Sequence, residues 1–152
     1  MQMNGKNHGE IAKARAMLQA QQEKLQQIRS AMQETKSEML DLDLRHHNLQ
    51  ATGDINKMMA LRSRAIALNK SVTGLSTSEA ECLVRIESME RYLETLNKKL
   101  EGLRHEASRL SEEIAVEGVA PDVKTKLQSL ASRIKMQIEG LEGKRRSGPI
   151  KL

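Results

Sequence analysis

A repeat of apolar residues keeps its phase from Met58 to Ile114, and it constrains the fold of this chain more than any other feature. Apolar residues recur there at alternating spacings of three and four, with no insertion or deletion, and only Glu79 interrupts them. This spacing puts one apolar stripe on an α-helix and is the pattern of a coiled-coil seam. It predicts one long helix that packs lengthwise against other helices.

A second repeat of the same kind runs earlier in the chain, from Ile11 to Leu49. Gln21, Thr35 and His46 interrupt it, and polar seam residues lower stability while fixing register. The two repeats predict which side chains hold the fold together. The principal seam residues are expected to be Leu18, Leu25, Ile28, Leu61, Leu68, Ile86, Leu93, Leu96, Leu100, Leu103 and Leu110.

Two short segments carry the residues of helix ends and turns. Gly53 followed by Asp54 is typical of a helix stop and an N-cap, and Gly118 followed by Pro121 is typical of a stop and a new first turn. We therefore expect helices over about 10–51, 54–117 and 121–142, between disordered tails at 1–9 and 143–152. The apolar stripe expected on the third helix is Val123, Leu127, Leu130, Ile134, Ile138 and Leu141.

The segment 71–78 is ambiguous, because it holds Gly74 among Ser and Thr residues that form helices poorly. Ser76 and Glu79 could also form a capping box, which would start a new helix. Val72 and Leu75 nevertheless keep the heptad phase. We favour one continuous helix over two helices with a break.

The helix lengths predict a layout. Both connections are short, so the first and third helices should run antiparallel to the middle one, which would span roughly 96 Å. Folding back at the two turns places Ile11 near Glu94 and Leu141 near Asn97. The predicted fold is all-α: an elongated antiparallel coiled-coil hairpin with a third helix folded back on the distal end of the middle helix.

Composition disfavours an enzyme. Tyr92 is the only aromatic residue, whereas ligand pockets are commonly lined by aromatic side chains. No phosphate-binding loop or serine-hydrolase motif occurs. The adjacent His46 and His47 lack the i, i+4 spacing of a helical zinc pair. We expect no catalytic residue, cofactor or metal site.

The single Cys82 cannot form a disulfide within the chain, and it stands at a seam position. We interpret it as a small buried apolar residue, with an interchain disulfide as the alternative. No apolar run is long enough to span a membrane, and no signal peptide is evident. These features predict a cytoplasmic protein without membrane association.

The net charge of +5 is concentrated in two zones. One zone contributes Lys57, Arg62 and Arg64 near the first turn. The other is the C-terminal tail, with the cations Lys144, Arg145, Arg146 and Lys151. Both zones are candidate contact points for an acidic partner.

These features favour a non-enzymatic coiled-coil protein that acts as a spacer or adaptor in an assembly. It would self-associate or dock on a helical or acidic protein, and Met58 and Met59 offer an adaptable contact surface. A non-specific nucleic-acid-binding accessory protein is an alternative, disfavoured because only Tyr92 could stack on bases. The hairpin architecture is also similar to that of small coiled-coil proteins of flagellar and type III export systems and of phage assembly. That resemblance implies a helical component or chaperone of a secretion or phage assembly system.

Overall fold

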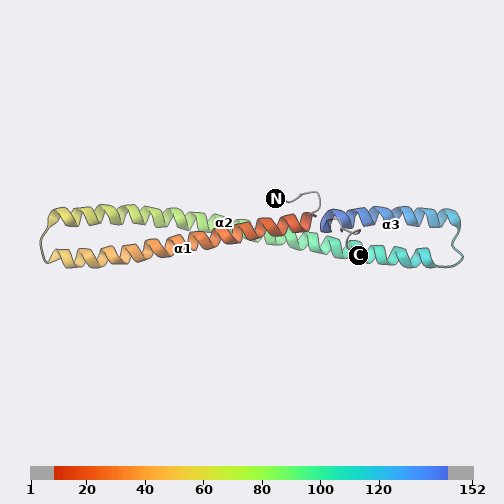
Figure 1. Ribbon diagram of the computed structural model, residues 1–152, viewed down its shortest axis with the longest axis horizontal. Coiled ribbons are helices and arrows are strands. Elements are labelled where there is room, and N and C mark those ends of the chain that lie inside the picture. Colours follow the sequence, from red (N-terminus) through yellow and green to blue (C-terminus); the bar gives the residue numbers. More distant parts are fainter. Residues whose placement is uncertain (1–8, 144–152) are drawn as a thin grey trace, which may run out of the picture. The chain divides into compact units, whose positions relative to one another are not determined.

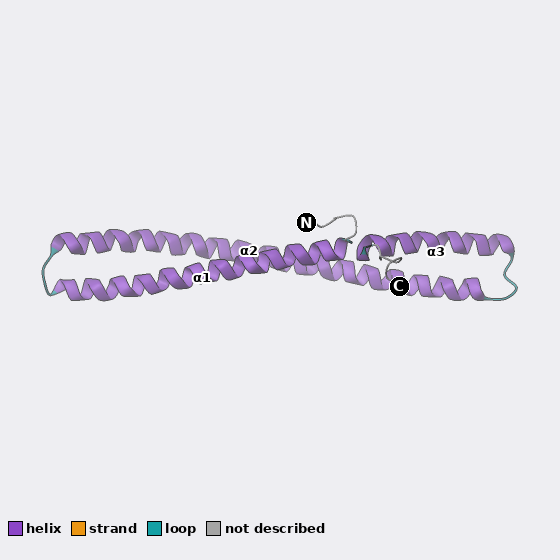
Figure 2. Cartoon of the chain, in the orientation of Figure 1, coloured by secondary structure: helices purple, strands orange, loops and turns teal. Residues whose placement is uncertain are grey.

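The computed structural model describes residues 9–143, and it is all-α with no strand among them (Figures 1 and 2). The three helices are α1 (Glu10–Gln50), α2 (Ile55–Ala115) and α3 (Pro121–Glu142). The described residues form two compact units, one of residues 19–87 and one of residues 9–18 with 88–143. Apart from Gly9 and Gly143, the tails predicted at 1–9 and 143–152 lie outside the described residues.

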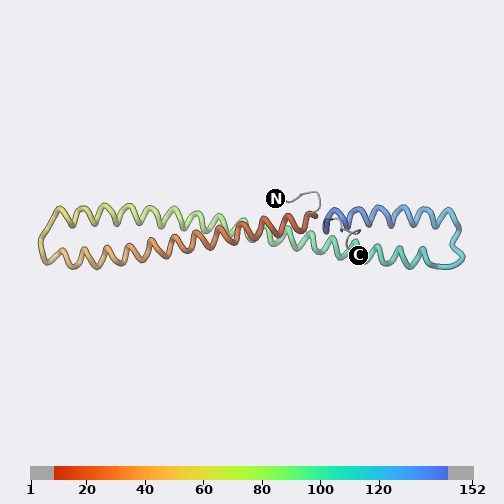
Figure 3. Tube along the Cα trace, viewed as in Figure 1, coloured from red at the N-terminus to blue at the C-terminus, as the bar shows by residue number. Residues whose placement is uncertain are grey.

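The first unit, residues 19–87, is an antiparallel hairpin of α1 and α2, whose trace turns at residues 51–54 (Figure 3). The amide of Gly53 donates to the carbonyl oxygen of Leu49 at 3.2 Å, and Gly53 has a φ of 67°. This left-handed conformation favours glycine and ends α1. The carboxylate of Asp54 accepts a hydrogen bond from the amide of Lys57 at 3.1 Å, so Asp54 caps α2 as predicted.

Helix α2 continues without a break through residues 71–78, which confirms the continuous helix that the heptad phase favours. The hydroxyl of Thr73 donates to the carbonyl oxygen of Asn69, and that of Thr77 donates to the carbonyl oxygen of Thr73. These local bonds satisfy the hydroxyl groups inside the helix. Packing of the seam thus outweighs the weak helix propensity of this segment.

The seam of the hairpin is narrow. The side chains at its predicted positions are buried or half-buried, and Cys82 is fully buried against Gln21, whose carbonyl oxygen lies 3.2 Å from its Sγ atom. Glu79, the interruption in the α2 repeat, pairs with Arg29 of α1 at 2.8 Å. Of the principal seam residues over both units, Ile28, Leu68, Ile86, Leu96, Leu100 and Leu110 are buried, and Leu18, Leu25, Leu61, Leu93 and Leu103 are half-buried.

The second unit contains a buried apolar cluster to which all three helices contribute. Ile11 and Ala14 at the start of α1 and Leu141 at the end of α3 pack together on Leu96 and Leu100 of α2. The predicted meeting of the two flanking helices near residues 94–97 is therefore confirmed. An ion pair between Arg104 of α2 and Glu142 of α3 lies beside this cluster.

Helix α3 differs from its predicted stripe. Val123 and Leu130 are exposed, whereas Ala131 is half-buried. The half-buried and buried positions Leu127, Ala131, Ile134, Ile138 and Leu141 follow a 4-3-4-3 spacing. Alanine can fill a heptad position when the helices approach closely. The prediction of Leu130 as a seam residue is therefore wrong, and Ala131 occupies that position.

Candidate interaction surface

The predicted basic zone near the first turn is partly neutralised by acidic residues. Arg64 donates to Glu38 of α1 from Nε at 3.0 Å and from Nη2 at 2.8 Å. Lys57 lies 3.9 Å from the carboxylate of Asp54. Arg62 has neither an ion pair nor a hydrogen bond to any side chain within residues 9–143. The three cations are therefore close together in the hairpin, but two of them are paired.

The basic tail that the sequence predicts as the other contact point lies outside the described residues. This holds for Lys144, Arg145, Arg146 and Lys151. Their role in binding stays a prediction.

Four of the large apolar side chains near the turn of the hairpin, two turns or less from the groove described below, project into solvent. The exposed fractions are 71% for Leu40 of α1 and 68%, 62% and 55% for Ile55, Met59 and Ile66 of α2. These side chains lie outside the seam, in which Leu42 is buried and Leu61 half-buried. In the isolated chain these apolar side chains contact water, and a bound partner could bury them.

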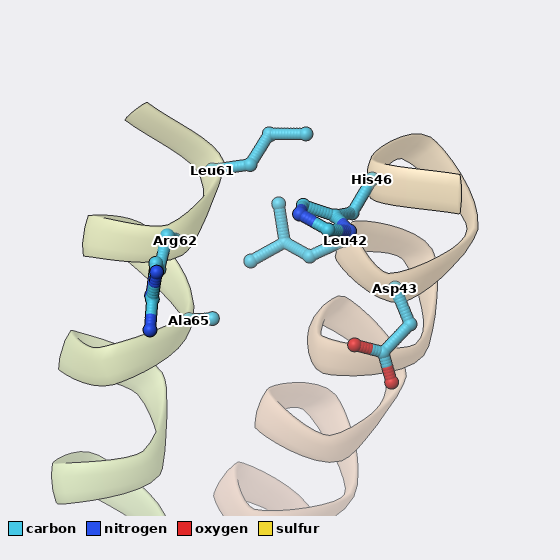
Figure 4. Close-up of a pocket in the computed structure, with 6 residues that line it drawn as sticks. All are labelled: Leu42, Asp43, His46, Leu61, Arg62 and Ala65. Carbon is cyan, nitrogen blue, oxygen red and sulfur yellow. The ribbon is translucent and has the colours of Figure 1, made fainter. Parts of the chain in front are cut away.

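A groove of about 320 Å³ crosses the seam at the same level (Figure 4). Leu42, His46, Leu61 and Ala65 form its floor, and Asp43 and Arg62 stand at its sides, one on each helix. Within residues 9–143, neither Asp43 nor Arg62 forms an ion pair or a side-chain hydrogen bond. Opposite charges therefore flank a floor made of three apolar side chains and the imidazole of His46.

The apolar side chains share the side of the hairpin on which this groove opens. Residues three, four and seven apart lie on one face of a helix. Ile55, Met59 and Ile66 have these spacings from Arg62, and Leu40 is three residues before Asp43. We call this surface the tip strip and define it as Leu40, Asp43, Ile55, Met59, Arg62 and Ile66.

Two residues of the tip strip, Met59 and Arg62, were predicted as contact residues, but the strip as a whole was not, although a signal for it was present. Ile55, Met59, Arg62 and Ile66 form a second 3-4 pattern on α2, offset from the seam residues. A helix with two apolar faces commonly packs against two neighbours. The seam repeat of α2 is much longer than this pattern, and it predicted only one apolar face for the helix.

Other candidate groups are distributed elsewhere. Arg109 donates hydrogen bonds to Glu106, which lowers the pKa of that carboxyl, and the same contact raises the pKa of Arg109. His46 lies in the groove floor and His47 is exposed. Over residues 9–143, His, Cys, Asp and Glu side chains form no group of three or more that could hold a metal ion.

No helix in the described part of the chain combines the length and the apolar character that crossing a membrane requires. The chain matches no known protein family, no curated protein and no solved structure. The candidate site therefore rests on the geometry of the tip strip.

Proposed function

We propose that this protein is a non-enzymatic coiled-coil adaptor or spacer, which takes part in an assembly by docking through its tip strip. The observation that carries the proposal is the exposure of Leu40, Ile55, Met59 and Ile66 on one side of a hairpin, beside a groove across its seam. Contiguous apolar surface of this kind is typical of protein–protein contacts. The proposal includes a reducing cytoplasm, which suits the single buried Cys82.

The size of the tip strip sets the strength of contact that it can support. Full burial of a Leu, Ile or Met side chain contributes about 1.5–3 kcal/mol. More than half of each of the four side chains is exposed, so covering them would contribute roughly 4–7 kcal/mol. Association itself costs about 4–15 kcal/mol. A single strip therefore suits a weak contact, and a stable one needs apolar surface from both partners.

Pairing within the hairpin makes nucleic acid the less favoured ligand. Contacts to phosphates need cations that are free to replace counterions. Arg64 and Lys57 already have carboxylate partners in Glu38 and Asp54. The tip strip instead combines apolar side chains with one cation and one anion, which suits a protein surface.

The experiment is affinity capture with tagged full-length chain from extracts of cells that express the protein. The wild-type chain is compared with L40Q/I66Q and with a control, V84Q. Val84 is also an exposed apolar residue of the hairpin, at 65%, but it lies on α2 eighteen residues beyond Ile66 and so outside the tip strip. We expect the wild type and V84Q to retain the same small set of proteins, and this set can include the untagged chain.

L40Q/I66Q should lose that set while keeping its helical circular dichroism. Equal retention by L40Q/I66Q would show that the tip strip does not carry the interaction. Retention of nucleic acid alone, with loss between about 50 and 200 mM salt, would favour the alternative function.

A further inference from the structure

Asp43 and Arg62 are opposite charges on the two helices of one hairpin, at the same level of one groove. We infer that the tip strip binds the tip strip of a second copy of this chain. The two hairpins lie parallel, with Asp43 of each copy against Arg62 of the partner subunit. This inference rests on the proposed function and names the partner of the same surface.

The symmetry follows from the arrangement of the hairpin. A two-fold axis that runs along the hairpin, above the groove, sets α1 of one copy opposite α2 of the other. Because Asp43 and Arg62 line the same groove, they stand at the same level, and the axis pairs each with its opposite charge. Two identical ion pairs result, as in any isologous interface.

The apolar side chains match under the same operation. The helices are antiparallel, so Leu40, three residues before Asp43, and Ile66, four residues after Arg62, lie one turn farther from the hairpin turn. The two-fold axis therefore sets Leu40 against Ile66 of the partner subunit. Met59, one turn closer to the hairpin turn, enters the same interface. Each copy covers the other's exposed apolar surface, so the buried area is twice that of one strip.

Charge selects a second copy over an unrelated partner. Four other charged residues near the turn are paired within the chain, Glu38 with Arg64 and Asp41 with Arg45. Asp43 and Arg62 are exposed and lack such pairs, so they favour a partner that presents a cation and an anion at matching positions. A second copy supplies both by symmetry.

Charge also selects the parallel arrangement. An antiparallel dimer centred on the tip strip would set α1 against α1 and α2 against α2. Asp43 would then face Asp43 of the partner subunit, and Arg62 would face Arg62 of the partner subunit. Like charges at an interface oppose association, so this arrangement is disfavoured.

The test measures molar mass against concentration for the full-length chain, by light scattering and sedimentation equilibrium. We expect a dimer for the wild type. D43R and R62D should each weaken it at least about tenfold, because each sets like charges opposite one another. An equal mixture of D43R and R62D should restore a dimer, since each variant supplies the charge that the other needs.

Repulsion within one chain cannot account for restoration by mixing, because each chain in the mixture still carries its own substitution. L40Q should weaken the dimer, whereas the control V84Q, at an exposed position of α2 far from the tip strip, should not. Circular dichroism of each variant checks that the helices remain folded. The double variant D43R/R62D should dimerise like the wild type.

Three results would overturn the inference. A wild-type chain that stays monomeric at every concentration is one, and a mixture of D43R and R62D that remains monomeric is another. The third is a D43R or R62D dimer that is as strong as the wild-type dimer, which is the result that the antiparallel arrangement predicts. A monomeric chain that still retains a different protein through the tip strip would overturn the dimer and leave the proposed function standing.

Discussion

Gly9 packs against the backbone of Leu141, so the start of α1 meets the last turn of α3. Gly9 is buried, and a Cβ atom built on it would overlap the carbonyl oxygen of Leu141 and the backbone of Glu142 and Gly143. Ile11 and Leu141 belong to the same buried cluster on α2. The junction of the two flanking helices therefore needs a residue without a side chain at position 9.

We expect Gly9→Ala to destabilise the protein by about 1–3 kcal/mol, because the added methyl group meets backbone that cannot move aside. Thermal and urea unfolding measure the loss. The matched control is Gly102→Ala in α2, where a Cβ would meet nothing within 4 Å. That variant should gain roughly 0.5–1 kcal/mol from helix propensity. A neutral Gly9→Ala would show that the helix ends do not touch.

Gly74 lies in the interior of α2 with open space around it, in the segment where the sequence left a break possible. We expect Gly74→Ala to stabilise the protein by roughly 0.5–1 kcal/mol, since alanine restricts the unfolded chain and favours helix. Hydrogen exchange of residues 71–78 should slow in the variant. Faster exchange or lower stability would argue that the helix needs a flexible point there.

Glu79 occupies a seam position that the repeat assigns to an apolar residue, and it pairs with the largely exposed Arg29. Glu79→Leu should stabilise the protein by about 1 kcal/mol, because an exposed ion pair contributes little and a seam leucine buries apolar surface. Glu81→Leu, at an exposed position of the same turn, is the control and should change stability by less than about 0.5 kcal/mol. A destabilised Glu79→Leu would mean that the ion pair holds the register of the hairpin.

Cys82 is fully buried and contacts Gln21 across the seam. Iodoacetamide should therefore leave Cys82 unmodified in the folded protein and react with it only after unfolding, as mass spectrometry would detect. The control, Ser88→Cys at an exposed position of α2, should react at once. Rapid modification of Cys82 under native conditions, or a dimer band without reductant, would revive the interchain disulfide.

The hydrogen bonds from Arg109 hold the pKa of Glu106 below its ordinary value of 4.5. A carboxyl whose pKa is lower in the folded state stabilises the fold above its unfolded pKa, and that contribution is lost as pH falls through the folded pKa. The wild type should therefore unfold at a slightly higher temperature than Glu106→Gln near neutral pH. The difference should shrink from about pH 4.5 downward. Arg109→Gln should also lower the unfolding temperature near neutral pH. A difference in unfolding temperature between the wild type and Glu106→Gln that stays constant at every pH would contradict this account.

The tip strip could be predicted only in part. Its α2 residues Ile55, Met59 and Ile66 show a regular spacing that the sequence displays. Leu40 and Asp43 could not be added, because their position depends on which residues of α1 lie beside which residues of α2. For the same reason, the sequence could not show that an acidic residue of α1 pairs with a cation of the basic zone. Only the folded hairpin brings Glu38 to Arg64.

The sequence by itself determined the local features of this protein. Heptad spacing set the seam of α1 and α2, and Gly53 with Asp54 set the first turn, because both act within a few residues along the chain. Tertiary structure decided the pairing of Arg29 with Glu79, the use of Ala131 in place of Leu130, and the side on which Asp43 and Arg62 face one groove. These depend on the register and spacing between helices, which side chains far apart in the sequence fix jointly when they pack.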